Sequence, residues 1–306
     1  MNAEAVVTSP GVQPGTVRAW LVASRPRTLV ATVVPVAVGT ACAFAAGKVR
    51  PRTAFAALVG AILIQIGTNL ANDVFDFERG ADTGERLGPT RAAQAGLLTP
   101  RQLRVGMWAA FSLATAAGVY LTAVAGPWVV GVGSISILLG IAYTGGPYPL
   151  GYNGLGDVFV FVFFGAVAVC GTACAQVGRV TQLSLIASLP VGALATGLLV
   201  VNNLRDWQAD AAAGKRTLAV RWGPRAVVWE YVALIGVAYA APIALFVSGL
   251  RGPWCLLPLA TFPWAVRLTR QVARERGRSL NARLADTARL LLFHGAAWTL
   301  GIALGS

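Results

Sequence analysis

Carboxylate and amide side chains gather in two short stretches of the chain. Seven of the twelve acidic residues lie in them, and these are Asp73, Asp76, Glu78, Asp82, Glu85, Asp206 and Asp210. Facing carboxylates repel one another and resist loss of water unless a cation lies between them. Mg²⁺ prefers oxygen ligands, takes one or two carboxylates and leaves positions for water and substrate phosphates. The pattern therefore predicts a magnesium site that binds a diphosphate.

Both stretches are predicted to continue an apolar helix, with their polar side chains on one face. In the first, Gln65, Asn69, Asn72 or Asp73, and Asp76 follow each other at steps of three or four residues. The second reads NNLRDWQADAAAGKRTL (202–218), where Asn203, Asp206 and Asp210 share a face in the same way. The expected metal ligands are Asn72, Asp73, Asp76, Asp82, Asn202, Asp206 and Asp210.

Basic residues beside the two stretches have a matching role. Arg91, Lys215 and Arg216 are expected to bind the diphosphate by charge-assisted hydrogen bonds. The simpler interpretation is that the acidic residues are solvated charges that cap two helices. Two such loops on one side of a chain this short of acid favour the metal site.

The elements that position these residues are predicted to be membrane-spanning helices. The chain has 306 residues, of which 56% are hydrophobic and 12% charged, and its mean hydropathy is +0.65. A span needs about 20 apolar residues as helix. Residues 1–17 form a polar N-terminal tail and 18–306 a single membrane domain. Nine spans are expected, at about 28–46, 54–72, 104–124, 127–144, 157–177, 184–203, 226–248, 252–271 and 287–304.

The basic residues set the expected orientation. The formal charge is +13, which could indicate a nucleic-acid partner. If the N-terminus is cytoplasmic and the spans alternate, however, 20 of the 25 Lys and Arg lie on the cytoplasmic side, as the positive-inside rule requires. Topology thus accounts for most of the charge, and no nucleic-acid partner is expected. Both acidic stretches fall on the cytoplasmic side of a multi-pass protein of the cell membrane.

The two motifs resemble those of a known family. Asn-Asp-x-x-Asp at 72–76, paired with Asp-x-x-x-Asp at 206–210 and a following Gly-Lys, is similar to the UbiA superfamily of intramembrane prenyltransferases. Within it, the chain looks like the 1,4-dihydroxy-2-naphthoate prenyltransferases of menaquinone biosynthesis. The segments that carry this likeness are SRPRTLVATVVPVAVGT (24–40), NDVFDFERGAD (72–82) with GPTRAAQAGLLTP (88–100), AYTGGPYPLGYNGLGDVFVFVFFG (142–165) and NNLRDWQADAAAGKRTLAVRWG (202–223).

The resemblance implies an all-α bundle of nine transmembrane helices, with a central cavity under cytoplasmic cap loops and a lateral opening to membrane lipid. It also implies Mg²⁺-dependent transfer of a polyprenyl group from polyprenyl diphosphate to 1,4-dihydroxy-2-naphthoate, with decarboxylation to demethylmenaquinone. The broad family pattern has a third acid where this chain has Gly80, and the nearest acid is Asp82. The naphthoate branch shares that Gly-x-Asp arrangement.

Roles for single residues follow from the same resemblance. The catalytic residues would be Asp76, Asp206, Asp210 and Tyr143, and the substrate-binding residues Asn69, Asn72, Arg91, Lys215, Arg216 and Arg25. Tyr143 would lie beside the reacting carbon, where an aromatic face stabilises an allylic cation, although it could instead be an interfacial anchor. Arg25 could bind the carboxylate of the acceptor or be a positive-inside anchor. Asp157 is explained by interaction with a helix N-terminus.

Other functions remain open on the sequence alone. The acceptor could be another aromatic compound such as 4-hydroxybenzoate, or the protein could be a terpene cyclase that needs no acceptor. An ion-coupled transporter would need acidic residues near the middle of the bilayer, whereas here they gather towards one surface.

Overall fold

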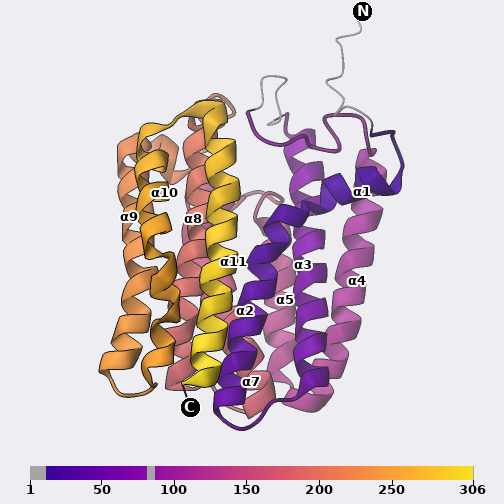
Figure 1. Ribbon diagram of the computed structural model, residues 1–306. Helices are drawn as coiled ribbons and strands as arrows, with labels where there is room; N and C mark the ends of the chain where they lie inside the picture. Colours follow the sequence, from indigo (N-terminus) through magenta and orange to yellow (C-terminus); the bar gives the residue numbers. More distant parts are fainter. Residues whose placement is uncertain (1–11, 81–86, 306) are drawn as a thin grey trace, which may run out of the picture.

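Helices account for all regular structure in the part of the chain that the computed structural model describes, residues 12–80 and 87–305. The order of elements is α1 (Val17–Ser24), α2 (Pro26–Ala45), α3 (Pro51–Glu78), α4 (Pro100–Ala125), α5 (Trp128–Ala142), η1 (Gly151–Asn153), α6 (Gly156–Val160), η2 (Phe161–Cys170), α7 (Gly171–Val177), α8 (Gln182–Ala212), α9 (Leu218–Val247), η3 (Pro253–Thr261), α10 (Phe262–Arg274), η4 (Gly277–Ser279) and α11 (Leu280–Leu304). Figure 1 shows the long helices running side by side.

Local signals fix where several helices begin. Thr99 and Gln102 form a capping box at the start of α4, and Thr181 and Ser184 form one at the start of α8. In each box two side chains satisfy backbone groups that the first helical turn leaves unpaired. Proline opens α2, α3 and α4, where its missing N–H costs no helical hydrogen bond.

Within residues 12–80 and 87–305, seven helices are long and apolar enough to cross a membrane: 28–45 of α2, α3, α4, the 156–177 helix, α8, α9 and 277–304 with α11. α5 is apolar but has only 15 residues. The span expected at 252–271 is split between the 3₁₀ helix η3 and α10, because Pro253, Pro258 and Pro263 lack the N–H groups that a continuous α-helix requires. The structure confirms an all-helical membrane-type chain, and the count of nine spans stays a prediction.

The buried apolar side chains form two clusters. One joins α1, α3, α4 and the 92–98 loop, with Leu70, Val74 and Phe111 among its members. The other joins α2, the 161–177 segment, α8, α9 and α11, around Tyr231 and Trp298. In Figure 1, α2 lies between the indigo-to-magenta helices on one side and the orange-to-yellow helices on the other. The bundle therefore has two halves whose polar ends can share one site.

The helix between residues 156 and 177 departs from α-helical geometry. Its middle, η2, is a π-helix of 10 residues, a wide form that is rare and is frequent at functional sites. One side packs tightly on α8, since a Cβ atom on Gly165 would lie 2.9 Å from the carbonyl oxygen of Ser188 and 3.0 Å from Cα of Gly192. Glycine is thus required at this contact. Another side of the same helix lines a cavity.

Candidate active site

The two acidic stretches meet at one end of the bundle. Asp76 lies in the last turn of α3 and Asp210 in the last turn of α8. Nζ of Lys215 lies 3.9 Å from Oδ1 of Asp76 and 3.4 Å from Oδ1 of Asp210. One ammonium group therefore spans both motifs, so a ligand as small as a diphosphate could contact both.

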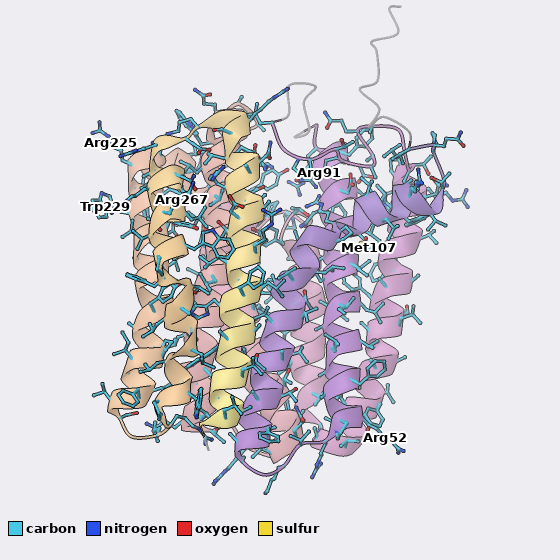
Figure 2. The ribbon with its side chains drawn as sticks, viewed as in Figure 1. Arg52, Arg91, Met107, Arg225, Trp229 and Arg267 are labelled. Atoms are coloured by element: carbon cyan, nitrogen blue, oxygen red, sulfur yellow. The ribbon has the colours of Figure 1, made fainter. Side chains whose placement is uncertain are left out.

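Asp76 has several polar partners. Its side chain is buried; Nη2 of Arg91 lies 2.5 Å from Oδ2, and the hydroxyl of Tyr152 donates to Oδ1 at 2.7 Å. Figure 2 places Arg91 near the polar end of the bundle, far from Arg52 at the opposite end. Buried charges persist only when paired and hydrogen-bonded, and these partners provide both for the Asp76 carboxylate.

Tyr152 is a site residue that sequence reasoning missed. Lys215 Nζ lies 4.7 Å and the Arg79 guanidinium carbon 5.5 Å from the centre of its ring, distances typical of cation–π contacts. Its carbonyl oxygen accepts a hydrogen bond from the backbone N–H of Arg216 at 2.7 Å. The side chain of Arg216 itself is exposed. A tyrosine in a glycine-rich loop has no spacing pattern that would mark this role.

Asp73 contacts the protein backbone. Its two carboxylate oxygens accept hydrogen bonds from the N–H groups of Ala92 and Ala93, at 2.9 and 3.2 Å. These bonds fix the loop that carries Arg91 against α3. The geometry thus gives Asp73 a positioning role, and its expected part in metal binding stays a prediction. Asp82 lies outside the described residues.

The second stretch is organised by Arg205, which sequence reasoning also missed. The guanidinium is buried and binds both carboxylate oxygens of Asp206, with Nε at 2.8 Å and Nη2 at 2.5 Å. It also donates to Oδ1 of Asn202 at 2.7 Å and to Oδ1 of Asn281 at 2.9 Å. Nδ2 of Asn281 in turn donates to the carbonyl oxygen of Leu87. One side chain thereby joins two of the expected metal ligands to α11 and the loop after α3.

Asn69 contacts the junction between α1 and α2. Its Nδ2 donates to the carbonyl oxygen of Ser24 at 2.8 Å and to Oγ1 of Thr28 at 3.1 Å. These bonds hold the junction of α1 and α2, where Arg25 has a left-handed φ of 52°. Such a conformation is rare outside glycine and persists where surrounding contacts impose it. Asn69 thereby positions the backbone that carries Arg25.

Asn72 has a contact of its own. Its Oδ1 accepts a hydrogen bond from the buried hydroxyl of Thr144 at 2.8 Å. This bond joins α3 to the residues that follow α5, next to Tyr143. The amide of Asn72 therefore couples the acidic stretch to the segment that reaches the cavity.

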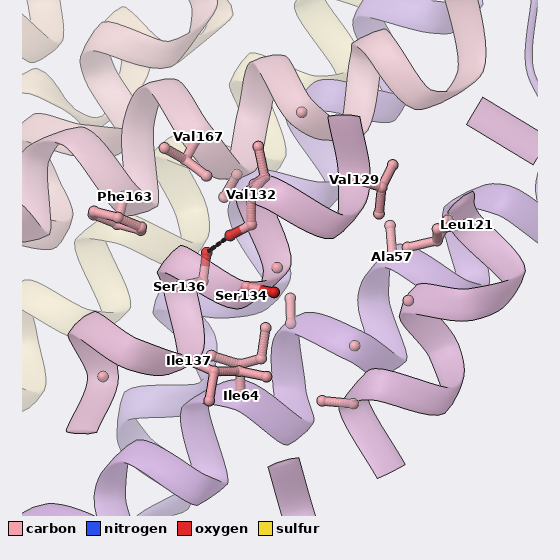
Figure 3. A pocket seen from close by; sticks show the side chains of 18 of the residues that line it. Ala57, Ile64, Leu121, Val129, Val132, Ser134, Ser136, Ile137, Phe163 and Val167 are labelled. Carbon is pink, nitrogen blue, oxygen red and sulfur yellow. Dashed lines mark hydrogen bonds between the residues drawn. The ribbon is translucent and has the colours of Figure 1, made fainter. Parts of the chain in front are cut away.

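A largely apolar cavity of about 450 Å³ lies below the acidic residues. It is lined by α2–α5 and the 156–177 helix, so elements of both halves of the bundle enclose it. Figure 3 shows Ile64, Leu121, Val132 and Phe163 around it. Tyr143 is part of the lining, and the next residue, Thr144, is hydrogen-bonded to Asn72 of the first acidic stretch. Tyr143 thus stands between the cavity and the polar end.

The arrangement suits a metal completed by a substrate. No three His, Cys, Asp or Glu side chains come close enough to hold an ion by themselves in residues 12–80 and 87–305. Mg²⁺ usually binds one or two carboxylates together with substrate phosphates. Asp76 and Asp210, with Lys215 between them, fit that pattern. An anionic headgroup would bind at this end and an apolar tail in the cavity.

Sequence comparison identifies close relatives. The 1,4-dihydroxy-2-naphthoate octaprenyltransferase of Mycobacterium tuberculosis is 40% identical over 285 residues, 93% of this chain and 95% of the relative. Proteins of that name from Escherichia coli and Bacillus subtilis are 36% and 31% identical; the matches cover 94% and 91% of this chain and 96% and 90% of the relatives.

Solved structures share the fold. A UbiA homolog from Aeropyrum pernix K1 has a TM-score of 0.70 at 14% identity, covering 88% of this chain and 96% of that one. A UbiA homolog from Archaeoglobus fulgidus bound to DMAPP and Mg²⁺ has a TM-score of 0.62 at 15% identity, covering 92% and 99%. The model of the UbiA prenyltransferase family matches residues 32–296. This chain therefore belongs to the UbiA prenyltransferase family.

Proposed function

We propose that the protein transfers a polyprenyl group from polyprenyl diphosphate to 1,4-dihydroxy-2-naphthoate in a Mg²⁺-dependent reaction. The observation that carries this proposal is the position of Lys215 between Asp76 and Asp210, at the polar end of an apolar cavity. The three named relatives support this choice of acceptor, since each covers nearly the whole chain.

Ionisation of the donor comes first. The allylic carbon–oxygen bond breaks and the diphosphate leaves with the electron pair. Mg²⁺ would be held by Asp76 and Asp210, with Asn72, Asn202 and Asp206 beside them, and when bound it would neutralise charge on the departing diphosphate. Lys215 and Arg91 are close enough to Asp76 to add charge-assisted hydrogen bonds to the same group.

The carbocation then needs protection from water. The cavity is lined mainly by apolar side chains, and exclusion of water prevents hydrolysis of a reactive intermediate. Tyr143 lies at the polar edge of this lining, where its ring face can stabilise positive charge. The prenyl tail would extend past α3, α4 and α5 towards Trp128 at the far end.

The acceptor ring completes the reaction. A ring carbon forms a bond to the prenyl group, the bond to the carboxylate breaks, and carbon dioxide leaves. Loss of CO₂ returns its bonding electron pair to the ring, so the product is the quinol form of demethylmenaquinone and no oxidant is needed. Arg25, held at the α1–α2 junction, is the proposed partner of the acceptor carboxylate.

The proposal includes an orientation. The N-terminus and the site face the cytoplasm in a cell-membrane protein, and α5 and the η3–α10 segment complete nine spans. The distribution of Lys and Arg supports this arrangement. A cytoplasmic site would receive the soluble acceptor from water and the donor tail from lipid.

The purified protein tests the function directly. It should be assayed with a polyprenyl diphosphate and an equimolar panel of 1,4-dihydroxy-2-naphthoate and 4-hydroxybenzoate, with Mg²⁺ or with EDTA. We expect prenylated naphthoquinol and one diphosphate per product, and neither with EDTA. Product from 4-hydroxybenzoate alone would reassign the acceptor. Diphosphate release with a cyclised hydrocarbon would indicate a terpene cyclase, and ion flux without diphosphate release a transporter.

A further inference from the structure

Asp157 is a buried carboxyl group outside the two acidic motifs. It is 5% exposed and lies in the first turn of the 156–177 helix. One oxygen, Oδ1, has no hydrogen-bond partner, and the carboxyl group interacts with its own backbone N–H. Interaction with the start of the helix therefore satisfies only part of the hydrogen-bonding capacity of the carboxylate. Buried polar atoms are nearly always bonded in native proteins, so an orphaned carboxylate oxygen calls for an explanation.

Asp157 has no ion-pair partner in the part of the chain that the structure describes. The titratable groups near it are Tyr143, which follows α5, and Glu230 on α9. Arg221, also on α9, lies by the loop before Asp157, since a Cβ atom on Gly154 would lie 3.4 Å from its Nε. α8, which packs against this helix, contributes the apolar Leu199 beside Gly156. A buried carboxylate without an ion-pair partner is a good proton acceptor, because proton uptake removes a charge from a medium of low polarity.

Tyr143 connects this carboxyl group with the cavity. Its side chain lines the cavity wall. Its hydroxyl packs against the residue before Asp157, since a Cβ atom on Gly156 would lie 2.8 Å from that oxygen. The order in space is thus cavity, Tyr143 and Asp157.

We propose that Asp157 takes up and returns the ring-hydroxyl proton of the aromatic acceptor, acting through the hydroxyl of Tyr143. This inference rests on the proposed function, because it needs an acceptor with a hydroxyl group next to its carboxylate. Asp157 is then a positioning residue for proton transfer, and Tyr143 is the group that reaches the substrate.

The proton transfer balances within the reaction. As the ring carbon bonds to the prenyl group, the neighbouring hydroxyl loses its proton to the oxygen of Tyr143, and Tyr143 passes its own proton to Asp157. The ring then carries a ketone beside the carbon that holds the carboxylate. The bond to the carboxylate breaks, CO₂ leaves, and the electron pair forms an enolate. The enolate oxygen recovers the proton by the reverse path, so none is consumed.

Asp157→Asn in the full-length protein tests the inference. We expect kcat for naphthoate prenylation to fall by about 10²- to 10⁴-fold, the usual contribution of general acid–base catalysis. The KM for polyprenyl diphosphate should stay at the wild-type value, and the acidic limb of the kcat–pH profile should disappear. Asp157→Glu should restore part of the rate and the acidic limb. Asp286→Asn, which removes an acid paired with Arg283 and Arg289, is the matched control and should change neither.

The outcomes separate this inference from the proposed function. A wild-type protein that does not prenylate 1,4-dihydroxy-2-naphthoate would overturn both. A wild-type protein that does so, beside an Asp157→Asn variant with kcat within about threefold, would overturn only the role of Asp157. A rate loss with the acidic limb retained and a raised donor KM would show a structural role instead. If Asp157→Asn does not fold, Asp157→Glu decides: a displaced acidic limb supports the inference, and an unchanged profile contradicts it.

Discussion

Lys215 Nζ lies 3.9 Å from Oδ1 of Asp76, a contact between the loop after α8 and the last turn of α3. The same nitrogen lies 3.4 Å from Asp210. It therefore holds together two groups of like charge that come from different halves of the bundle. A diphosphate bound there would contact an ammonium group that the fold has already placed.

Replacement of Lys215 should weaken donor binding. Hydrogen bonds to charged groups contribute about 1.5–3 kcal/mol, so Lys215→Met should raise the KM for polyprenyl diphosphate by about ten- to a hundredfold. Initial rates of diphosphate release at varied donor concentration measure this. Arg216→Met is the matched control and should have a small effect, because its observed contact is made by its backbone N–H. An equal rise in the donor KM in both variants would contradict a specific role of the Lys215 side chain in donor binding.

Substitution of Asp73 should affect stability, whereas substitution of Asp76 should affect catalysis. Asp73→Asn should lower the melting temperature and increase proteolysis within 87–98, because a carboxylate oxygen that accepts from the loop is lost. Asp76→Asn should instead abolish diphosphate release and change the Mg²⁺ concentration dependence. Thermal unfolding, limited proteolysis and Mg²⁺ titration of both variants check this. A raised Mg²⁺ requirement in Asp73→Asn, with an unchanged melting temperature, would make Asp73 a metal ligand after all.

Loss of Arg205 should destabilise the folded protein. Removing one partner of a buried ion pair costs about 3–5 kcal/mol, and the Arg205 side chain is only 1% exposed. Arg205→Met should therefore give a clear fall in the melting temperature in detergent. Arg289→Met is the control, because Arg289 pairs with Asp286 at 66% exposure, and exposed pairs contribute about 0–1 kcal/mol. Equal melting temperatures for the two variants would refute a structural role for Arg205.

Filling the cavity should limit the length of the prenyl donor. Gly133 lines the cavity and Gly131 does not, although both lie in α5 and a Cβ atom on either would meet open space. Gly133→Leu should thus raise the KM for long donors and leave that for dimethylallyl diphosphate unchanged. Gly131→Leu should behave like the wild type. Product analysis with prenyl donors of increasing chain length tests this. Identical product profiles for the two variants would mean that the prenyl tail does not lie in this cavity.

Residue types and their spacing were enough to predict the membrane class and a prenyl-transfer function. Apolar runs of about 20 residues fix the long helices, because lipid offers no partner to a free backbone group. Period-3.6 spacing put Asn72 and Asp76 on one face of α3, and the second motif repeated the pattern. Residue type and local spacing were sufficient for these conclusions. Seven of the expected spans correspond to long apolar helices in the described part of the structure.

The partner that each side chain takes depends on the folded arrangement of the helices and loops. Asp73 and Asp76 look equivalent in sequence, yet Asp73 binds the backbone of the 92–93 turn and Asp76 binds Arg91 and Tyr152. Those partners come from distant loops, and no local period encodes them. The prolines of the expected 252–271 span indicate its break, whereas no local pattern marks Arg205 and Tyr152 as residues that contact the expected metal ligands. Their roles arise from burial and hydrogen bonding between helices, which exist only once the chain has folded.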